Sequence, residues 1–70
     1  MIQVVAISLK EKGKIYYFSP NNFPLKKGIT VIVETEKGLQ FGKVEKETIE
    51  IPESKIKYPL KKVIRIDNFF

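Results

Sequence analysis

The sequence predicts an all-β domain in which five antiparallel strands form a small barrel or a strongly curved sheet of SH3-like or OB-like size. Apolar and polar residues alternate with the period of two that half-buried strands show. The tripeptide Glu-Lys-Gly occurs at residues 11–13 and 36–38, each time between two such stretches, and marks two hairpin turns. No stretch shows the pattern of an amphipathic helix. We therefore expect residues 1–70 to form a single small β domain.

The first hairpin is predicted from residues 3–9 and 15–18, with its turn at residues 10–13. Both faces of residues 3–9 are apolar, which predicts a central strand. Residues 19–28 hold two prolines, two asparagines and a glycine, and this composition is typical of an ordered connection. Phe23 and Leu25 are its expected anchors.

The second hairpin is predicted over residues 28–44, with a turn that ends at Gly38. Leu39 and Phe41 are expected to continue the apolar face of the preceding strand. Val44 is out of phase with them, so a bulge at Gly42 is expected to return its side chain to the core.

The chain after this hairpin predicts a short strand at residues 48–51, stopped by Pro52, then a loop with one helical turn and a last strand at residues 63–66. Alternate residues of a strand point to the same face, and the apolar residues that share a face in this way define the expected core. It consists of Val5, Ile7, Ile15, Val31, Val33, Leu39, Phe41, Ile64 and Ile66.

The chain contains neither cysteine nor histidine, so disulfides, thiolate metal sites and the usual zinc ligand sets are excluded. No activatable nucleophile is present, and no cofactor is expected. Glu34 and Glu36 are two residues apart, but we interpret them as solvated charges at a strand end. The sequence therefore predicts a domain that is not an enzyme and has no catalytic or metal site.

The formal net charge is +5 and the predicted pI about 9.6. An excess of lysine is typical either of an anionic partner or of a solvated surface. The lysines are spread along the chain and alternate with glutamates, which favours the solvated surface.

Nucleic-acid binding is the alternative function. Lys12, Lys14 and Tyr16 are alternate residues, followed by Phe18, and would place cations and aromatic rings on one strand face. Lys61 and Lys62 form a second basic group. The alternative hypothesis is weak, non-specific binding of single-stranded RNA through these residues.

No apolar run has the length of a membrane span, and the N-terminus lacks the features of a signal peptide, so we expect a cytoplasmic protein. The abundance of lysine, glutamate and isoleucine indicates a thermophilic source. Phe69 and Phe70 end the chain with apolar side chains that a small barrel has little room to bury. These phenylalanines and Arg65 are the predicted interaction residues.

Three ordered blocks of the sequence, VVAISLKEKGKIYYFSP, VIVETEKGLQFGKV and PLKKVIRI, resemble the N-terminal part of the bacterial regulatory proteins of the YaaT/RicT type. The resemblance implies a cytoplasmic regulator that acts in a complex with small partner proteins and influences RNA processing and developmental decisions. Family members are longer, and their downstream cysteines are associated with iron–sulfur clusters. This chain has no cysteine, so the resemblance implies no cofactor here.

The matching positions suit turns and a core rather than catalysis. They are Gly13, Lys14, Tyr16, Tyr17, Phe18, Glu34, Thr35, Gly38, Gly42, Pro59, Leu60, Val63, Ile64 and Arg65. We therefore expect the N-terminal interaction or scaffold domain of a longer regulator, whose partners are other proteins, the downstream part of the same chain, or a second copy in a homodimer.

Overall fold

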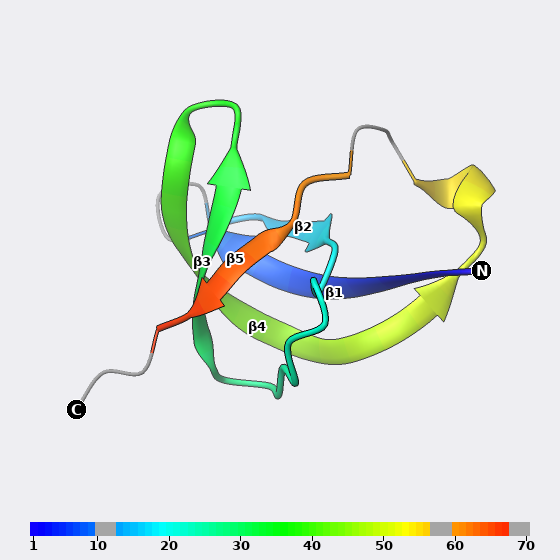
Figure 1. The fold of residues 1–70 in the computed structure, drawn as a ribbon, viewed down its shortest axis with the longest axis horizontal. Coiled ribbons are helices and arrows are strands. Elements are labelled where there is room, and N and C mark those ends of the chain that lie inside the picture. Colours follow the sequence, from blue (N-terminus) through cyan, green and yellow to red (C-terminus); the bar gives the residue numbers. More distant parts are fainter. Residues whose placement is uncertain (10–12, 57–59, 68–70) are drawn as a thin grey trace.

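The computed structural model describes residues 1–9, 13–56 and 60–67 (Figure 1). Its elements are β1 (Ile2–Leu9), β2 (Ile15–Phe18), β3 (Thr30–Thr35), β4 (Gly38–Ile51), the 3-10 turn η1 (Glu53–Lys55) and β5 (Val63–Ile66). The strands form one five-stranded antiparallel sheet in the order β2-β1-β4-β3-β5. The predicted all-β class is confirmed.

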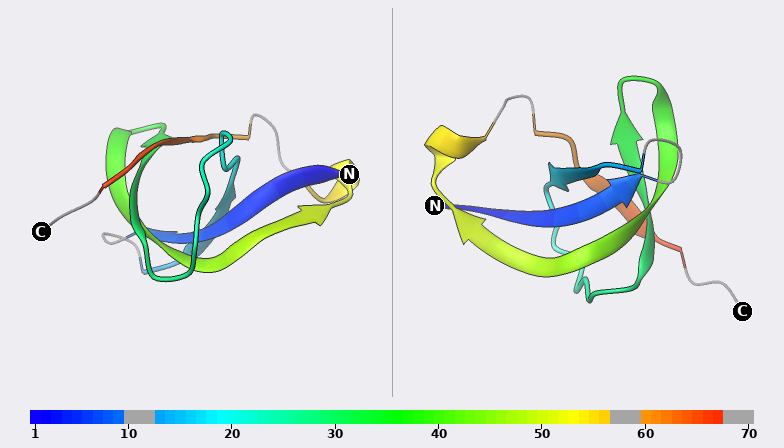
Figure 2. Two further views of the ribbon diagram at one scale, coloured as in Figure 1. Left: turned by 60° about the horizontal axis from the view of Figure 1, so that its bottom comes forward. Right: turned by 180° about the vertical axis from the view of Figure 1, so that it is seen from behind.

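The curvature of the sheet comes largely from β4. This strand has 14 residues, pairs with β3 along its first half and continues alongside β1 to Ile51, opposite Ile2. Two register shifts in the β1–β4 pairing lie on either side of Ala6, and irregularities of this kind bend a strand. Figure 2 shows that β4 is strongly bent along its length. The two halves of β4 thus belong to differently oriented parts of one strongly curved sheet.

The two end strands of the sheet, β2 and β5, meet at an isolated parallel bridge between Ser19 and Lys62. Ser19 N–H donates to the C=O of Lys61 at 2.8 Å, and Val63 N–H donates to the C=O of Ser19 at 3.0 Å. Ser19 makes this contact just after the end of β2, so the residues of β2 itself do not pair with β5. The sheet is therefore strongly curved, as predicted, whereas closure into a barrel is not confirmed.

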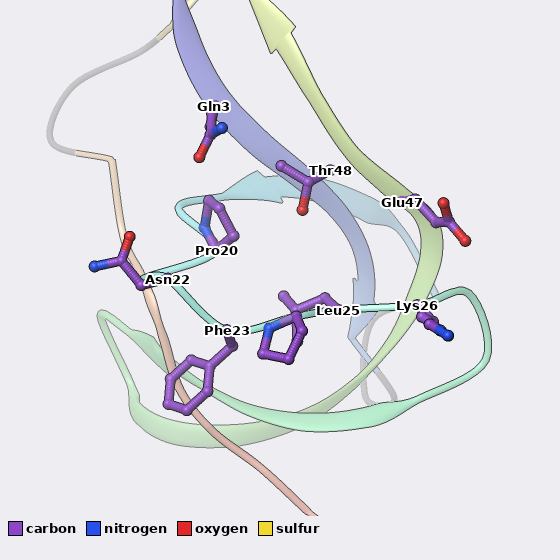
Figure 3. A pocket seen from close by; sticks show the side chains of 9 residues that line it. Gln3, Pro20, Asn22, Phe23, Leu25, Lys26, Glu47 and Thr48 are labelled. Carbon is purple, nitrogen blue, oxygen red and sulfur yellow. The ribbon is translucent and has the colours of Figure 1, made fainter.

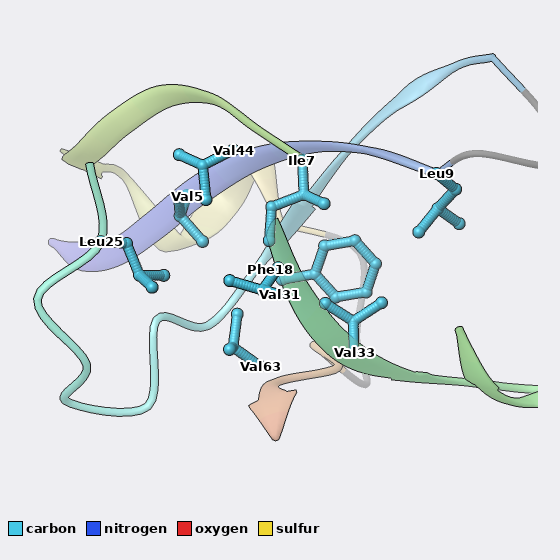
Figure 4. Close-up of a cluster of buried hydrophobic side chains, with 9 residues drawn as sticks. All are labelled: Val5, Ile7, Leu9, Phe18, Leu25, Val31, Val33, Val44 and Val63. Atoms are coloured by element: carbon cyan, nitrogen blue, oxygen red, sulfur yellow. The ribbon is translucent and has the colours of Figure 1, made fainter. Parts of the chain in front are cut away.

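The core lies on the concave side of the sheet (Figure 4). Its members are the buried side chains of Val5, Ile7, Leu9, Phe18, Leu25, Val31, Val33, Val44 and Val63. β1 lies between β2 and β4, and Val4 and Ala6 on its other face are buried as well. The prediction of a central first strand is therefore confirmed.

The prediction of which β4 side chains face the core is wrong, because the second hairpin has a two-residue turn. Thr35 pairs with Gly38, and the Thr35 hydroxyl accepts from Lys37 N–H at 3.2 Å and donates to the C=O of Gly38 at 2.8 Å. A change of one residue in register turns every side chain of a strand to the opposite face. Leu39 and Phe41 consequently point outward and are 65% and 49% exposed.

Val44 is fully buried without a bulge at Gly42. In this register Val31 lies opposite Gly42, so Gly42 and Val44 share the concave face. A Cβ atom on Gly42 would lie 2.5 Å from Cγ2 of Ile7, so the missing side chain allows β1 to pack closely on β4.

Two other predicted core residues lie elsewhere. Ile15 pairs with Ser8, on the face of β1 opposite the core, and is 57% exposed. A register shift in the β3–β5 pairing brings Val63 and Ile66 toward the core and leaves Ile64 only half-buried.

The connection between the hairpins is ordered as predicted. Leu25 is buried in the core and Phe23 packs against it. The side-chain amide of Asn21 donates to the C=O of Val63 at 3.0 Å, and Asn21 and Asn22 have positive φ values of 52° and 64°. η1 follows Pro52, as the sequence predicts.

Candidate interaction surface

The aromatic and basic residues predicted for nucleic-acid binding are only partly brought together. Lys12 lies outside the described residues, whereas Lys14 is exposed just before β2. Tyr16 lies opposite Ile7 and is 38% exposed at the rim of the concave face. Phe18 is a core residue, so its ring is not available for stacking on a base.

The second basic group lies beside the end of β2. Lys62 is exposed and pairs with Ser19, and the C=O of the half-buried Lys61 accepts from the same serine. The structure thus joins the end of β2 to the segment before β5, which are more than 40 positions apart in the sequence. Lys14 precedes β2, and Lys61 and Lys62 precede β5, so the described lysines of the two groups lie next to the two end strands of the sheet.

Phe69 and Phe70, predicted as interaction residues, lie outside the described residues. Arg65 is exposed in β5 and pairs with Ile32 of β3. Ile32 also pairs with Phe41 of β4. These three side chains therefore form a row across β4, β3 and β5 on the outer face of the sheet.

We call this row, together with Leu39, the outer patch: Ile32, Leu39, Phe41 and Arg65. Leu39 lies two residues from Phe41 in β4 and points to the same face. Ile32 is nearly buried between its neighbours, at 8% exposure, whereas Leu39 and Phe41 are widely exposed. An apolar surface flanked by an arginine is a composition common in protein interfaces.

Sequence reasoning missed the outer patch because it assigned Leu39 and Phe41 to the core. The alternation itself is correct, but alternation does not show which of the two faces is buried. The feature that identifies the buried face is the length of the turn, in which Thr35 pairs with Gly38 and its hydroxyl bonds to Lys37 N–H and the Gly38 C=O.

An open hollow of about 520 Å³ lies between the 20–26 connection and the adjoining parts of β1 and β4 (Figure 3). Pro20, Phe23 and Leu25 give it an apolar wall, and Lys26 and Glu47 bring charges of both signs. Gln3, Asn22, Pro24 and Thr48 complete the lining. Glu47 is the single carboxylate among these lining residues, which include no histidine or cysteine.

The described residues contain no group of three or more acidic, histidine or cysteine side chains placed to hold a metal ion. Within the same part of the chain, no helix has the length and hydropathy needed to cross a membrane. Glu34 lies in β3 and Glu36 in the turn, and both carboxylates are exposed.

Comparison with known proteins shows what this chain is similar to. The chain is 41% identical over 66 residues to the Stage 0 sporulation protein YaaT of Bacillus subtilis (strain 168), a match that covers 94% of this chain and 24% of YaaT. The predicted YaaT-type relationship is confirmed. No family model matches the chain, and no solved structure matches it.

The chain spans about a quarter of the length of YaaT. Because the match covers 66 of the 70 residues, β2 to β5 lie within the YaaT-type segment. The outer patch and the exposed residues of β2 are therefore features of this segment.

Proposed function

We propose that this chain is a non-catalytic protein-interaction module of a cytoplasmic regulator of developmental control. The observation that carries the proposal is the 41% identity to YaaT, a protein named for stage 0 of sporulation, over 94% of the chain. The absence of histidine and cysteine from the sequence supports a role without catalysis.

The outer patch is the proposed docking surface. Leu39 and Phe41 expose apolar side chains on a face that the core does not use, and Arg65 adds a planar cation that can pair with a partner carboxylate. Burying apolar surface under a partner protein stabilises the complex, at roughly 25 cal/mol per Å² removed from water. The apolar side chains and the single arginine of the patch suit recognition of a protein surface that is apolar and acidic.

Replacing the matching segment of YaaT with this chain tests the proposal. The chimera would be expressed from the native locus in Bacillus subtilis, beside a strain that carries intact YaaT and a strain in which the segment is deleted. We expect the chimera to support spore formation and the deletion to abolish it, because the inserted module supplies the same contacts. A chimera that accumulates at the level of YaaT and yields no more spores than the deletion strain contradicts the proposal.

A further inference from the structure

β2 is an end strand of the sheet, and part of its backbone faces away from β1. Leu9 N–H donates to the C=O of Lys14 at 3.2 Å, which makes these residues a hydrogen-bonded pair. Such pairs alternate with non-bonded pairs along an antiparallel ladder, so Tyr16 is the next residue that bonds to β1. The N–H and C=O groups of Ile15 and Tyr17 therefore point along the outer edge.

The fold limits the length of this edge at both ends. Beyond β2, the N–H and C=O of Ser19 also point outward, and they are taken by Lys61 and Val63. Before β2, Gly13 has a φ of 63° and its N–H bonds back to the C=O of Leu9, so the chain turns away there. Only a short extended segment fits between these limits.

We propose that this segment is β2 of a second copy of the chain, paired antiparallel across a two-fold axis at Tyr16. In this register Ile15 of each copy lies opposite Tyr17 of the other, and their outward N–H and C=O groups satisfy one another. Tyr16 lies opposite its own copy in a non-bonded pair, where side chains approach most closely. The pairing deepens the proposed interaction role by naming a second copy as one partner.

The residues of the edge suit self-pairing. Ile15–Phe18 carries no charge, no proline and no bulge, the features by which natural sheets protect an open edge. Ile15, Tyr16 and Tyr17 are all exposed, at 57%, 38% and 50%. Lys14 would lie opposite Phe18 of the other copy, so the register brings no like charges into direct opposition. Isologous two-fold contacts are also the commonest in small oligomers.

Cysteine cross-linking of the full chain tests the register, since the sequence has no native cysteine. Across a non-bonded pair the Cα atoms lie about 4.5 Å apart, within the range of a disulfide. Tyr16→Cys should thus form a cross-linked dimer under mild oxidation. The matched control is Lys14→Cys, because two copies of residue 14 would lie about 13 Å apart along the strands. We expect Tyr16→Cys to cross-link on the order of tenfold faster.

Sedimentation of two cysteine-free variants tests the hydrogen bonds. Tyr17→Pro removes an N–H that β1 does not use, and proline is tolerated at such an edge position. Tyr17→Thr removes the same ring and keeps the N–H. We expect the native chain to show a concentration-dependent dimer, Tyr17→Thr to retain self-association, and Tyr17→Pro to weaken it about tenfold or more. Circular dichroism confirms that each variant is folded.

Equal cross-linking rates for Tyr16→Cys and Lys14→Cys, or a native chain that is monomeric at its highest soluble concentration, would overturn the self-pairing. Loss of self-association in Tyr17→Thr to the same extent as in folded Tyr17→Pro would also contradict it. These results are independent of spore formation by the YaaT chimera. A monomeric chain in a working chimera removes the self-pairing and leaves the proposed interaction role in place.

Discussion

Gly42→Ala places a methyl group where β1 packs most closely on β4. The added Cβ would lie 2.5 Å from Cγ2 of Ile7 and 3.2 Å from the C=O oxygen of Ser8. Ile7 is fully buried and branched at Cβ, so its side chain has little freedom to move aside. Overpacking of this kind costs about 1–3 kcal/mol. Alanine in place of glycine within a strand stabilises the fold by roughly 0.5–1 kcal/mol and offsets part of this cost.

The midpoints of these two ranges leave a net loss of about 1 kcal/mol, which lowers the Tm of a domain of this size by about 4–8 °C. Thermal unfolding followed by circular dichroism measures it. Lys43→Ala is the matched control, because it changes the next residue of β4 at an exposed position and should remain within about 0.5 kcal/mol of the native chain. A Gly42→Ala variant that is as stable as the native chain, or more stable, would refute the close approach of the two strands.

Three further predictions concern β4, the connection between the hairpins and the basic residues. Val44→Ala should destabilise the domain by roughly 2 kcal/mol in urea unfolding, because it empties part of the core, whereas Leu39→Ala should change stability by less than about 0.5 kcal/mol. The reverse order would show that β4 has the opposite phase. Asn21→Ala should lower the free energy of unfolding by about 1–2 kcal/mol in the same assay, because it removes the hydrogen bond to the Val63 C=O and forces alanine into a positive φ. An unchanged free energy of unfolding would show that this hydrogen bond does not anchor the connection. A fluorescent single-stranded RNA titrated at low and moderate salt tests the alternative function: binding through Lys14 and Lys62 should weaken steeply as salt rises, and no binding at low salt removes that function.

Local patterns in the sequence were sufficient to predict most of the fold. Alternation and composition predict the positions of β1, β2, β3, β5 and the first part of β4, and the two faces of β1 predict its central place in the sheet. The phase of β4 could not be obtained in this way, because it depends on whether the turn before Gly38 contains two or three residues. The length of β4 was also missed, because residues 48–51 continue the strand that bends beside β1.

The candidate surfaces were harder to predict than the fold. The outer patch follows from the phase of β4, so the error in phase assigned Leu39 and Phe41 to the core. The bonds between Ser19 and the Lys61–Val63 segment join positions far apart in the chain, and no local pattern encodes such a contact. The edge of β2 becomes visible only when the strand order and the bonding of each residue are known.

Spore formation by the YaaT chimera with an altered outer patch tests the central claim most directly. Leu39→Ser with Phe41→Ser removes the exposed apolar side chains of the patch, and Ile49→Ser is the matched control, because Ile49 is 45% exposed in the same strand but lies beyond the patch. Both variant chimeras should accumulate to the level of the unaltered chimera. The account predicts that the double variant loses spore formation and that Ile49→Ser retains it. Normal spore formation by the double variant would contradict the claim that this chain acts by docking a partner protein on the outer patch.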